Sequence, residues 1–64
     1  MVIVNGEAKD AAGKSLKQLL DEEGYELSRI VVERNLEIVP KESYDTIIIE
    51  DNDSIEVLSF VGGG

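Results

Sequence analysis

Carboxylates are the only abundant reactive side chains in this sequence. Its 64 residues include fourteen Asp and Glu, six Lys and Arg, and neither Cys nor His. The chain therefore lacks a thiol nucleophile, a thiolate ligand for zinc or iron–sulfur clusters, and an imidazole base. A domain of this length also has a thin core and little room for an internal cleft. These limits argue against an enzyme that acts alone and leave a binding module, a carrier or modifier, or a small subunit.

The acidic residues do not form a recognisable site. Asp51-Asn52-Asp53 invites comparison with a calcium-binding loop, but Ile55 and Glu56 stand where that loop needs an oxygen ligand and a glycine. The segment is better explained as a tight turn. The remaining candidates for acid–base chemistry all fall on predicted strand edges or turns: Glu33, Glu37, Glu42 and Glu56. A carboxylate that is solvated in this way is not expected to act as a general acid or base. We therefore expect no bound cofactor and no metal site.

The last three residues, Gly62, Gly63 and Gly64, present a different kind of reactive group, an α-carboxylate on a thread without side chains. With Val61, an extended thread of this length could reach about 13 Å from the folded body. Because glycine has no Cβ, such a thread could enter a channel too narrow for other residues. A frayed end or a cloning remnant is the alternative explanation.

The strand predicted just before these glycines has apolar residues on both faces. Ile55 and Val57 share one face, whereas Leu58 and Phe60 share the other. A single helix covers only one face of a sheet, so one pair should remain exposed and mark a partner site. We take Leu58, Phe60 and Val61 as the partner-binding residues; the alternative is that Phe60 folds under the sheet edge and seals the core.

The remaining sequence predicts the elements that position this terminus. A strand at residues 2–4 should turn at Asn5-Gly6 into a second strand at 7–10. Ser15 and Gln18 form a capping-box pattern before a helix with a stripe of Leu16, Leu19 and Leu20, and Gly24 should end it. Further extended segments are expected at residues 30–34, 36–39, 46–49 and 54–61, with a turn or single helical turn at 41–45.

This order predicts an α+β fold of the β-grasp, ubiquitin-like type. A mixed sheet of about five strands would carry the helix on one face, with the first and last strands parallel and central. A ferredoxin-like variant is the alternative. We predict one β-grasp domain over residues 1–61 and a flexible tail over residues 62–64.

Charge limits the possible partners. The net charge is −8, with six acids against four bases in residues 1–32 and eight against two in residues 33–64. This charge disfavours nucleic acid and anionic membrane surfaces, and a partner that reads it should be basic, although the acidity could simply support solubility. With no leader-like or long apolar segment, we expect a cytoplasmic protein that is monomeric when free.

The same residues resemble the ThiS family, the sulfur carrier proteins of thiamine thiazole synthesis. The shared pattern runs in order along the whole chain: Asn5-Gly6-Glu7, Leu19-Leu20, Val32-Glu33-Arg34-Asn35, Glu37-Ile38-Val39-Pro40, Tyr44, and Val61-Gly62-Gly63-Gly64 after residues 55–60. One departure is Asn52, where family members often have glycine between two aspartates.

The resemblance implies a mechanism located at Gly64. A ThiF-like enzyme would use ATP to adenylate its carboxylate, a persulfide donor would supply sulfur, and a ThiG-like thiazole synthase would accept sulfur from the resulting thiocarboxylate. The chain would then be a protein co-substrate rather than an enzyme. Alternatives are the small subunit of molybdopterin synthase, which also ends in Gly-Gly, a ubiquitin-like modifier of lysines, and an interaction module with an inert tail.

Overall fold

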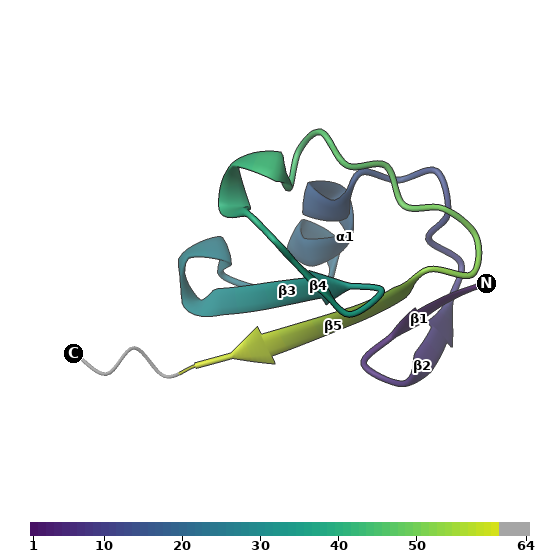
Figure 1. Cartoon of the computed structure of the whole chain (residues 1–64), viewed down its shortest axis with the longest axis horizontal. Helices are drawn as coiled ribbons and strands as arrows, with labels where there is room; N and C mark the ends of the chain where they lie inside the picture. Colours follow the sequence, from purple (N-terminus) through teal and green to yellow (C-terminus); the bar gives the residue numbers. More distant parts are fainter. Residues whose placement is uncertain (61–64) are drawn as a thin grey trace.

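The computed structural model describes residues 1–60, which form one five-stranded sheet and a layer of short helices (Figure 1). The elements in chain order are β1 (Val2–Val4), β2 (Glu7–Lys9), α1 (Leu16–Glu22), η1 (Leu27–Arg29), β3 (Ile30–Arg34), β4 (Glu37–Val39), η2 (Lys41–Ser43) and β5 (Ser54–Ser59). The strand order is β2-β1-β5-β3-β4. Strands β1 and β5 are parallel, and the other neighbours are antiparallel. The predicted β-grasp fold, with parallel first and last strands at the centre, is confirmed.

The first hairpin forms where Asn5-Gly6 predicts it. Both turn residues have positive φ, 49° and 84°, as a two-residue turn between right-twisted strands requires. Val4 and Glu7 face one another across the turn. The second strand ends at Lys9, one residue earlier than predicted.

Helix α1 begins and ends at the predicted signals. The Ser15 hydroxyl accepts a hydrogen bond from the Gln18 amide at 3.1 Å, so Ser15 is the N-cap. The Gln18 side chain donates to Glu22 instead of returning to Ser15, and only half of the capping box forms. At the other end Gly24 has φ +83°, and the amides of Gly24 and Tyr25 donate to Asp21 and Leu20, which is a Schellman motif.

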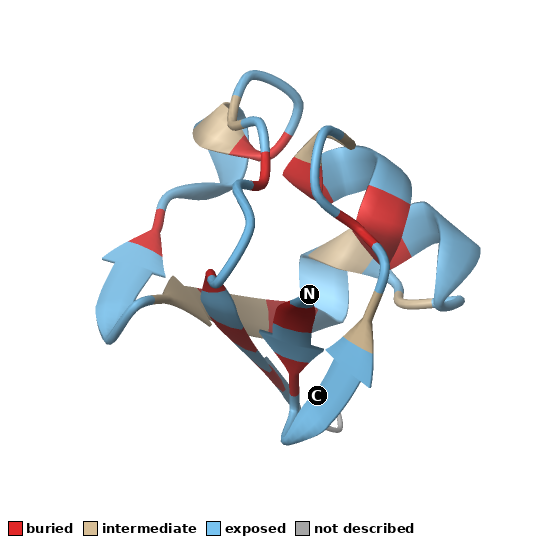
Figure 2. Ribbon diagram, turned by 90° about the vertical axis from the view of Figure 1, so that its right-hand side faces the viewer, coloured by how far each residue is buried: buried red, intermediate tan, exposed pale blue. Residues whose placement is uncertain are grey.

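The core lies between α1 and the sheet face that it covers. Leu16, Leu19 and Leu20 are each no more than 3% exposed. They pack into one cluster with the inward residues of the strands and with Ala11, Tyr44 and Ile49. Figure 2 shows the helices and connecting segments on one side of the sheet, so within residues 1–60 no layer covers the opposite face.

Two further predicted segments differ from the structure. The segment 46–49 is not a strand: Ile48 forms a single bridge with Ser15, and the backbone of Ile49 bonds to Gly13 and Lys14, just before α1. The extended segment expected from Leu36 begins only at Glu37, because Asn35 and Leu36 form a second two-residue turn with φ of 52° and 71°. Leucine rarely adopts this conformation, so its sequence carries no local signal for the turn.

Candidate functional site

Strand β5 is the element that leads toward the glycine-rich terminus, and it lies at the centre of the sheet (Figure 1). All five residues of β3 pair with β5, from Arg34 opposite Ile55 to Ile30 opposite Ser59. Strand β1 pairs only with its beginning, at Ser54 and Ile55. The first half of β5 is therefore held from both sides, and its second half from one side.

The structure places the described site residues on the uncovered face. Leu58 is 53% exposed and Phe60 is 48% exposed, while Ile55 and Val57 point into the core. The alternative in which Phe60 seals the core is therefore wrong. Strand β5 ends at Ser59, and the Phe60 amide still donates to the Arg29 carbonyl at 3.0 Å. Val61, Gly62, Gly63 and Gly64 lie outside the described residues, as does the predicted domain boundary at residue 61.

The uncovered face, which we call the outer sheet face, is defined by the alternation of each strand and by the register of its neighbours. Its outward residues are Ile3, Ala8, Val31, Glu33, Ile38, Ser54, Glu56 and Leu58, and Phe60 continues it beyond β5. Ile38 is 69% exposed, more than Leu58. Apolar groups of this size that remain in water are typical of a protein contact surface.

Asn5 holds β5 at the point where β1 ends, a contact that the sequence analysis missed. Its side-chain carbonyl accepts the Val57 amide at 2.8 Å, and its side-chain amide donates to the Tyr25 hydroxyl at 3.1 Å. The backbone amide of Asn5 also donates to Ile55 at 2.9 Å. The turn residue thus extends the parallel ladder with its side chain.

A buried aspartate fixes the beginning of β5. Asp53 is 6% exposed, and its carboxylate accepts hydrogen bonds from Arg34 Nε at 2.9 Å, Asn35 Nδ2 at 3.0 Å and the Glu50 amide at 2.9 Å. The Asn35 side chain in turn accepts the Ser54 amide. Burial by itself would raise the pKa of Asp53, but the three donors and the Arg34 charge outweigh it and hold that pKa below its ordinary value.

Replacing Asp53 by Asn should destabilise the fold by about 1–3 kcal/mol at neutral pH. The side-chain NH₂ of Asn would point a donor at groups that are themselves donors, and the negative charge beside Arg34 would be lost. The folded-state pKa is lowered, so this contribution is present above the ordinary aspartate pKa, near pH 4, and is lost as the pH falls through the folded value. Urea unfolding of both proteins across this range should show their difference shrinking in acid.

Asp10→Asn is the matched control, since Asp10 is exposed and the same charge is removed. Its stability should stay close to that of the unmodified chain at every pH. A difference between the Asp53 variant and the unmodified chain that persists undiminished at about pH 2 would contradict the assigned role of the carboxylate.

Other shifted groups lie on helix and turn surfaces. A hydrogen bond to Asp21 raises the pKa of Lys17, and a hydrogen bond from Lys14 lowers the pKa of Glu22. The amino terminus, bonded to Asp51, lowers the pKa of that carboxyl. These exposed ion pairs contribute little to stability, because solvent screens them. Tyr44 is different, since it belongs to the core, where burial raises the pKa of its hydroxyl.

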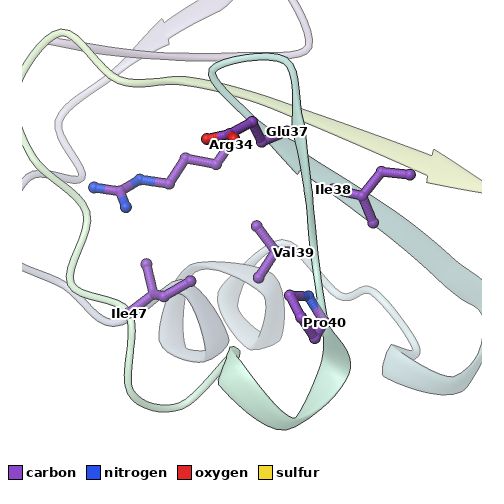
Figure 3. Close-up of a pocket in the computed structure, with 6 residues that line it drawn as sticks. All are labelled: Arg34, Glu37, Ile38, Val39, Pro40 and Ile47. Carbon is purple, nitrogen blue, oxygen red and sulfur yellow. The ribbon is translucent and has the colours of Figure 1, made fainter.

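A hollow of about 240 Å³ lies beside the edge strand β4 (Figure 3). Val39 and Ile47 face one another across it, and Pro40, Ile38, Glu37 and Arg34 complete its wall. Arg34 forms an ion pair with Asp53, so the ionisable groups of this wall do not form an acid–base pair.

Within residues 1–60, no three acidic side chains gather closely enough to hold a metal ion. No helix in the same range is long and apolar enough to cross a bilayer.

Comparison with known proteins gives a consistent picture. Residues 2–64 match the ThiS family. The chain is 40% identical to the sulfur carrier protein ThiS of Bacillus subtilis, with complete coverage of both chains. It is also 42% identical to a segment of the thiazole synthase of Paramagnetospirillum magneticum; this match covers 98% of the chain but only 20% of that longer protein. The crystal structure of a thiamine biosynthesis protein (ThiS) from Geobacter metallireducens superposes with a TM-score of 0.78, at 31% identity and with 98% and 97% of the two chains covered.

Proposed function

Because the chain belongs to the ThiS family, we propose that it is a sulfur carrier for synthesis of the thiamine thiazole, with the carboxylate of Gly64 as the carrier group. The observation that carries this proposal is the end-to-end match to a ThiS sulfur carrier at 40% identity. The β-grasp fold and the absence of Cys and His from the sequence agree with a protein whose chemistry is performed by its partners.

The proposed chemistry has three steps. The Gly64 carboxylate attacks the α-phosphorus of ATP on a ThiF-like enzyme, pyrophosphate leaves, and a poor acyl donor becomes a mixed anhydride. The terminal sulfur of a persulfide then attacks the acyl carbon and displaces AMP, and a thiol cleaves the sulfur–sulfur bond to leave the thiocarboxylate. The chain binds no cofactor in this scheme, since ATP is used by its partner.

The fold supports this role because β5, which leads toward the reacting terminus, is held rigidly in the sheet. Asn35, which is bonded to Asp53, holds the first residue of β5, and Asn5 holds Val57. Strand β3 pairs with β5 as far as Ser59. A carrier needs such a rigid attachment point because the acyl carbon must reach within about 3–3.5 Å of its reaction partner. The exposed side chains of Leu58 and Phe60 then lie immediately before the tail, where a partner that receives Gly64 would also contact them.

Thiazole synthase is the partner with the most direct support. The thiazole synthase of Paramagnetospirillum magneticum contains a segment similar to 98% of this chain, and that of Magnetococcus marinus contains one similar to 95% of it, at 39% identity. Titration calorimetry should therefore detect binding to the thiazole synthase of the same organism. Preferential binding to a molybdopterin synthase large subunit would contradict the assignment to thiamine synthesis.

Phe60→Ala should weaken binding to the ThiF-like enzyme by about 2 kcal/mol or more, as is common for an aromatic anchor at an interface. Its effect on stability should be smaller, because Phe60 is 48% exposed in the free protein. Affinity and thermal melting are to be measured on the same variant.

Leu36→Ala is the control, since Leu36 is also apolar and 89% exposed but lies at the β3–β4 turn, at the opposite end of β3 from Phe60. This change should leave the affinity nearly unaltered. If Phe60→Ala kept full affinity and lowered the melting temperature strongly, Phe60 would belong to the fold and not to the contact surface.

A further inference from the structure

Two carboxylates face one another in the middle of the outer sheet face. Glu33 of β3 and Glu56 of β5 are direct cross-strand partners. Side chains in this relation have Cβ atoms about 4.5–5.5 Å apart, and like charges placed so are unfavourable. In the described part of the chain, neither carboxylate forms an ion pair, and the outward residues of the five strands include no Lys or Arg. Arg29, which precedes β3, pairs with Glu26 at 3.1 Å.

Apolar side chains surround this acidic pair. Val31 and Leu58 form the next cross-strand pair toward the end of β5, and Ile38 of β4 lies beside Glu33. A protein that covered Leu58 and Ile38 would also remove water from the two carboxylates. Burying an uncompensated charge is costly, whereas a carboxylate that gains a charged hydrogen-bond donor is stabilised. The covering surface must therefore supply a cation at this point.

We propose that the outer sheet face docks on a surface of thiazole synthase that is apolar around one arginine, whose guanidinium bridges Glu33 and Glu56. The inference rests on the proposed function and adds the chemistry of the partner surface. Arginine fits better than lysine, because its planar fork offers donors to two carboxylates at once and its charge is less strongly hydrated.

Charge disfavours the other occupants of this face. A second copy of the chain would bring four carboxylates together and oppose two bodies of net charge −8. Nucleic acid and an anionic lipid surface would meet the same repulsion. A basic, partly apolar protein surface is the occupant that compensates both the charges and the exposed side chains.

The test compares Glu56→Gln with Glu42→Gln in the full chain, using purified thiazole synthase from the same organism as the probe. Both variants lose one negative charge, but Glu42 lies on η2, in the layer on the covered side of the sheet. We expect Glu56→Gln to bind at least about tenfold more weakly and Glu42→Gln to bind nearly as the unmodified chain does. Free Glu56→Gln should unfold at the same or a higher urea concentration, because a repulsion has been removed.

A loss of affinity together with unchanged or raised stability is a combination that a merely structural role for Glu56 cannot produce. Equal losses in both variants would show that only net charge matters, and unchanged or improved binding by Glu56→Gln would overturn the arginine contact. The intact mass of the chain after activation separates the carrier proposal from the docking proposal. If the unmodified chain gains sulfur while Glu56→Gln binds normally, only the docking proposal fails. A chain that never gains sulfur fails as a carrier, whatever its variants bind.

Discussion

Deleting Gly63 and Gly64 should abolish ATP–pyrophosphate exchange with the cognate ThiF-like enzyme. The reason is distance. Removal of two residues shortens an extended chain by roughly 7 Å, whereas the carboxylate must approach the α-phosphate to about 3–3.5 Å. Appending one residue after Gly64 should also abolish exchange, because an amide then stands where the carboxylate is needed. Gly63→Val should fail as well, since its branched side chain would obstruct a narrow channel.

Thermal melting controls for loss of the fold. The described core lies entirely within residues 1–60, so all three variants should melt close to the unmodified chain. Normal exchange by the shortened or extended chain would end the carrier proposal and leave an interaction module as the remaining interpretation.

Leu20→Ala should destabilise the domain by about 2–5 kcal/mol, the range measured for buried leucine truncation. Leu20 is fully buried between α1 and the sheet, as is Leu16, and Leu19 is 3% exposed. A chain of this size has only about 3–10 kcal/mol of total stability. The truncation should therefore remove a large part of the stability and move the urea midpoint far down, and the same holds for Leu16→Ala and Leu19→Ala.

Lys17→Ala is the matched control on the same helix. Its side chain is exposed and pairs with Asp21 on the helix surface, so its loss should leave stability nearly unchanged. Losses below about 1 kcal/mol in all three leucine variants would mean that α1 does not pack on the sheet as described.

The parts of the fold that the sequence predicts are those with local signals. Asn5-Gly6 specifies its hairpin because both residues tolerate positive φ, and Ser15 and Gly24 mark the two ends of α1 with their own hydrogen bonds. The alternation of β5 likewise predicts that Leu58 and Phe60 lie opposite Ile55 and Val57, since strand side chains alternate.

The parts that the sequence does not predict depend on contacts between distant residues. The turn at Asn35 and Leu36 is such a case, because the Asn35 side chain bonds to Asp53 and Ser54 about twenty positions away. The β-branched segment 46–49 has strand-like composition, yet its backbone partners lie at the start of α1. The burial of Asp53 and the bond from Val57 to Asn5 follow only once β5 lies in the middle of the sheet.

The same holds for the candidate site. The exposed apolar residues of β5 follow from its own pattern, but the opposition of Glu33 and Glu56 requires the register between β3 and β5. Each glutamate alone is an ordinary surface residue in the sequence. Only the pairing shows that both belong to one uncovered face with Leu58 and Ile38.

The central claim is that Gly64 carries sulfur as a thiocarboxylate, and the intact mass of the chain tests it most directly. The purified chain is incubated with ATP, a persulfide source, a thiol and the cognate ThiF-like enzyme, and its mass is compared with that of a sample without ATP. We predict an ATP-dependent increase equal to the replacement of one oxygen by one sulfur, located by fragmentation at Gly64. An unchanged mass, with an enzyme that activates another ThiS chain under the same conditions, would contradict the account.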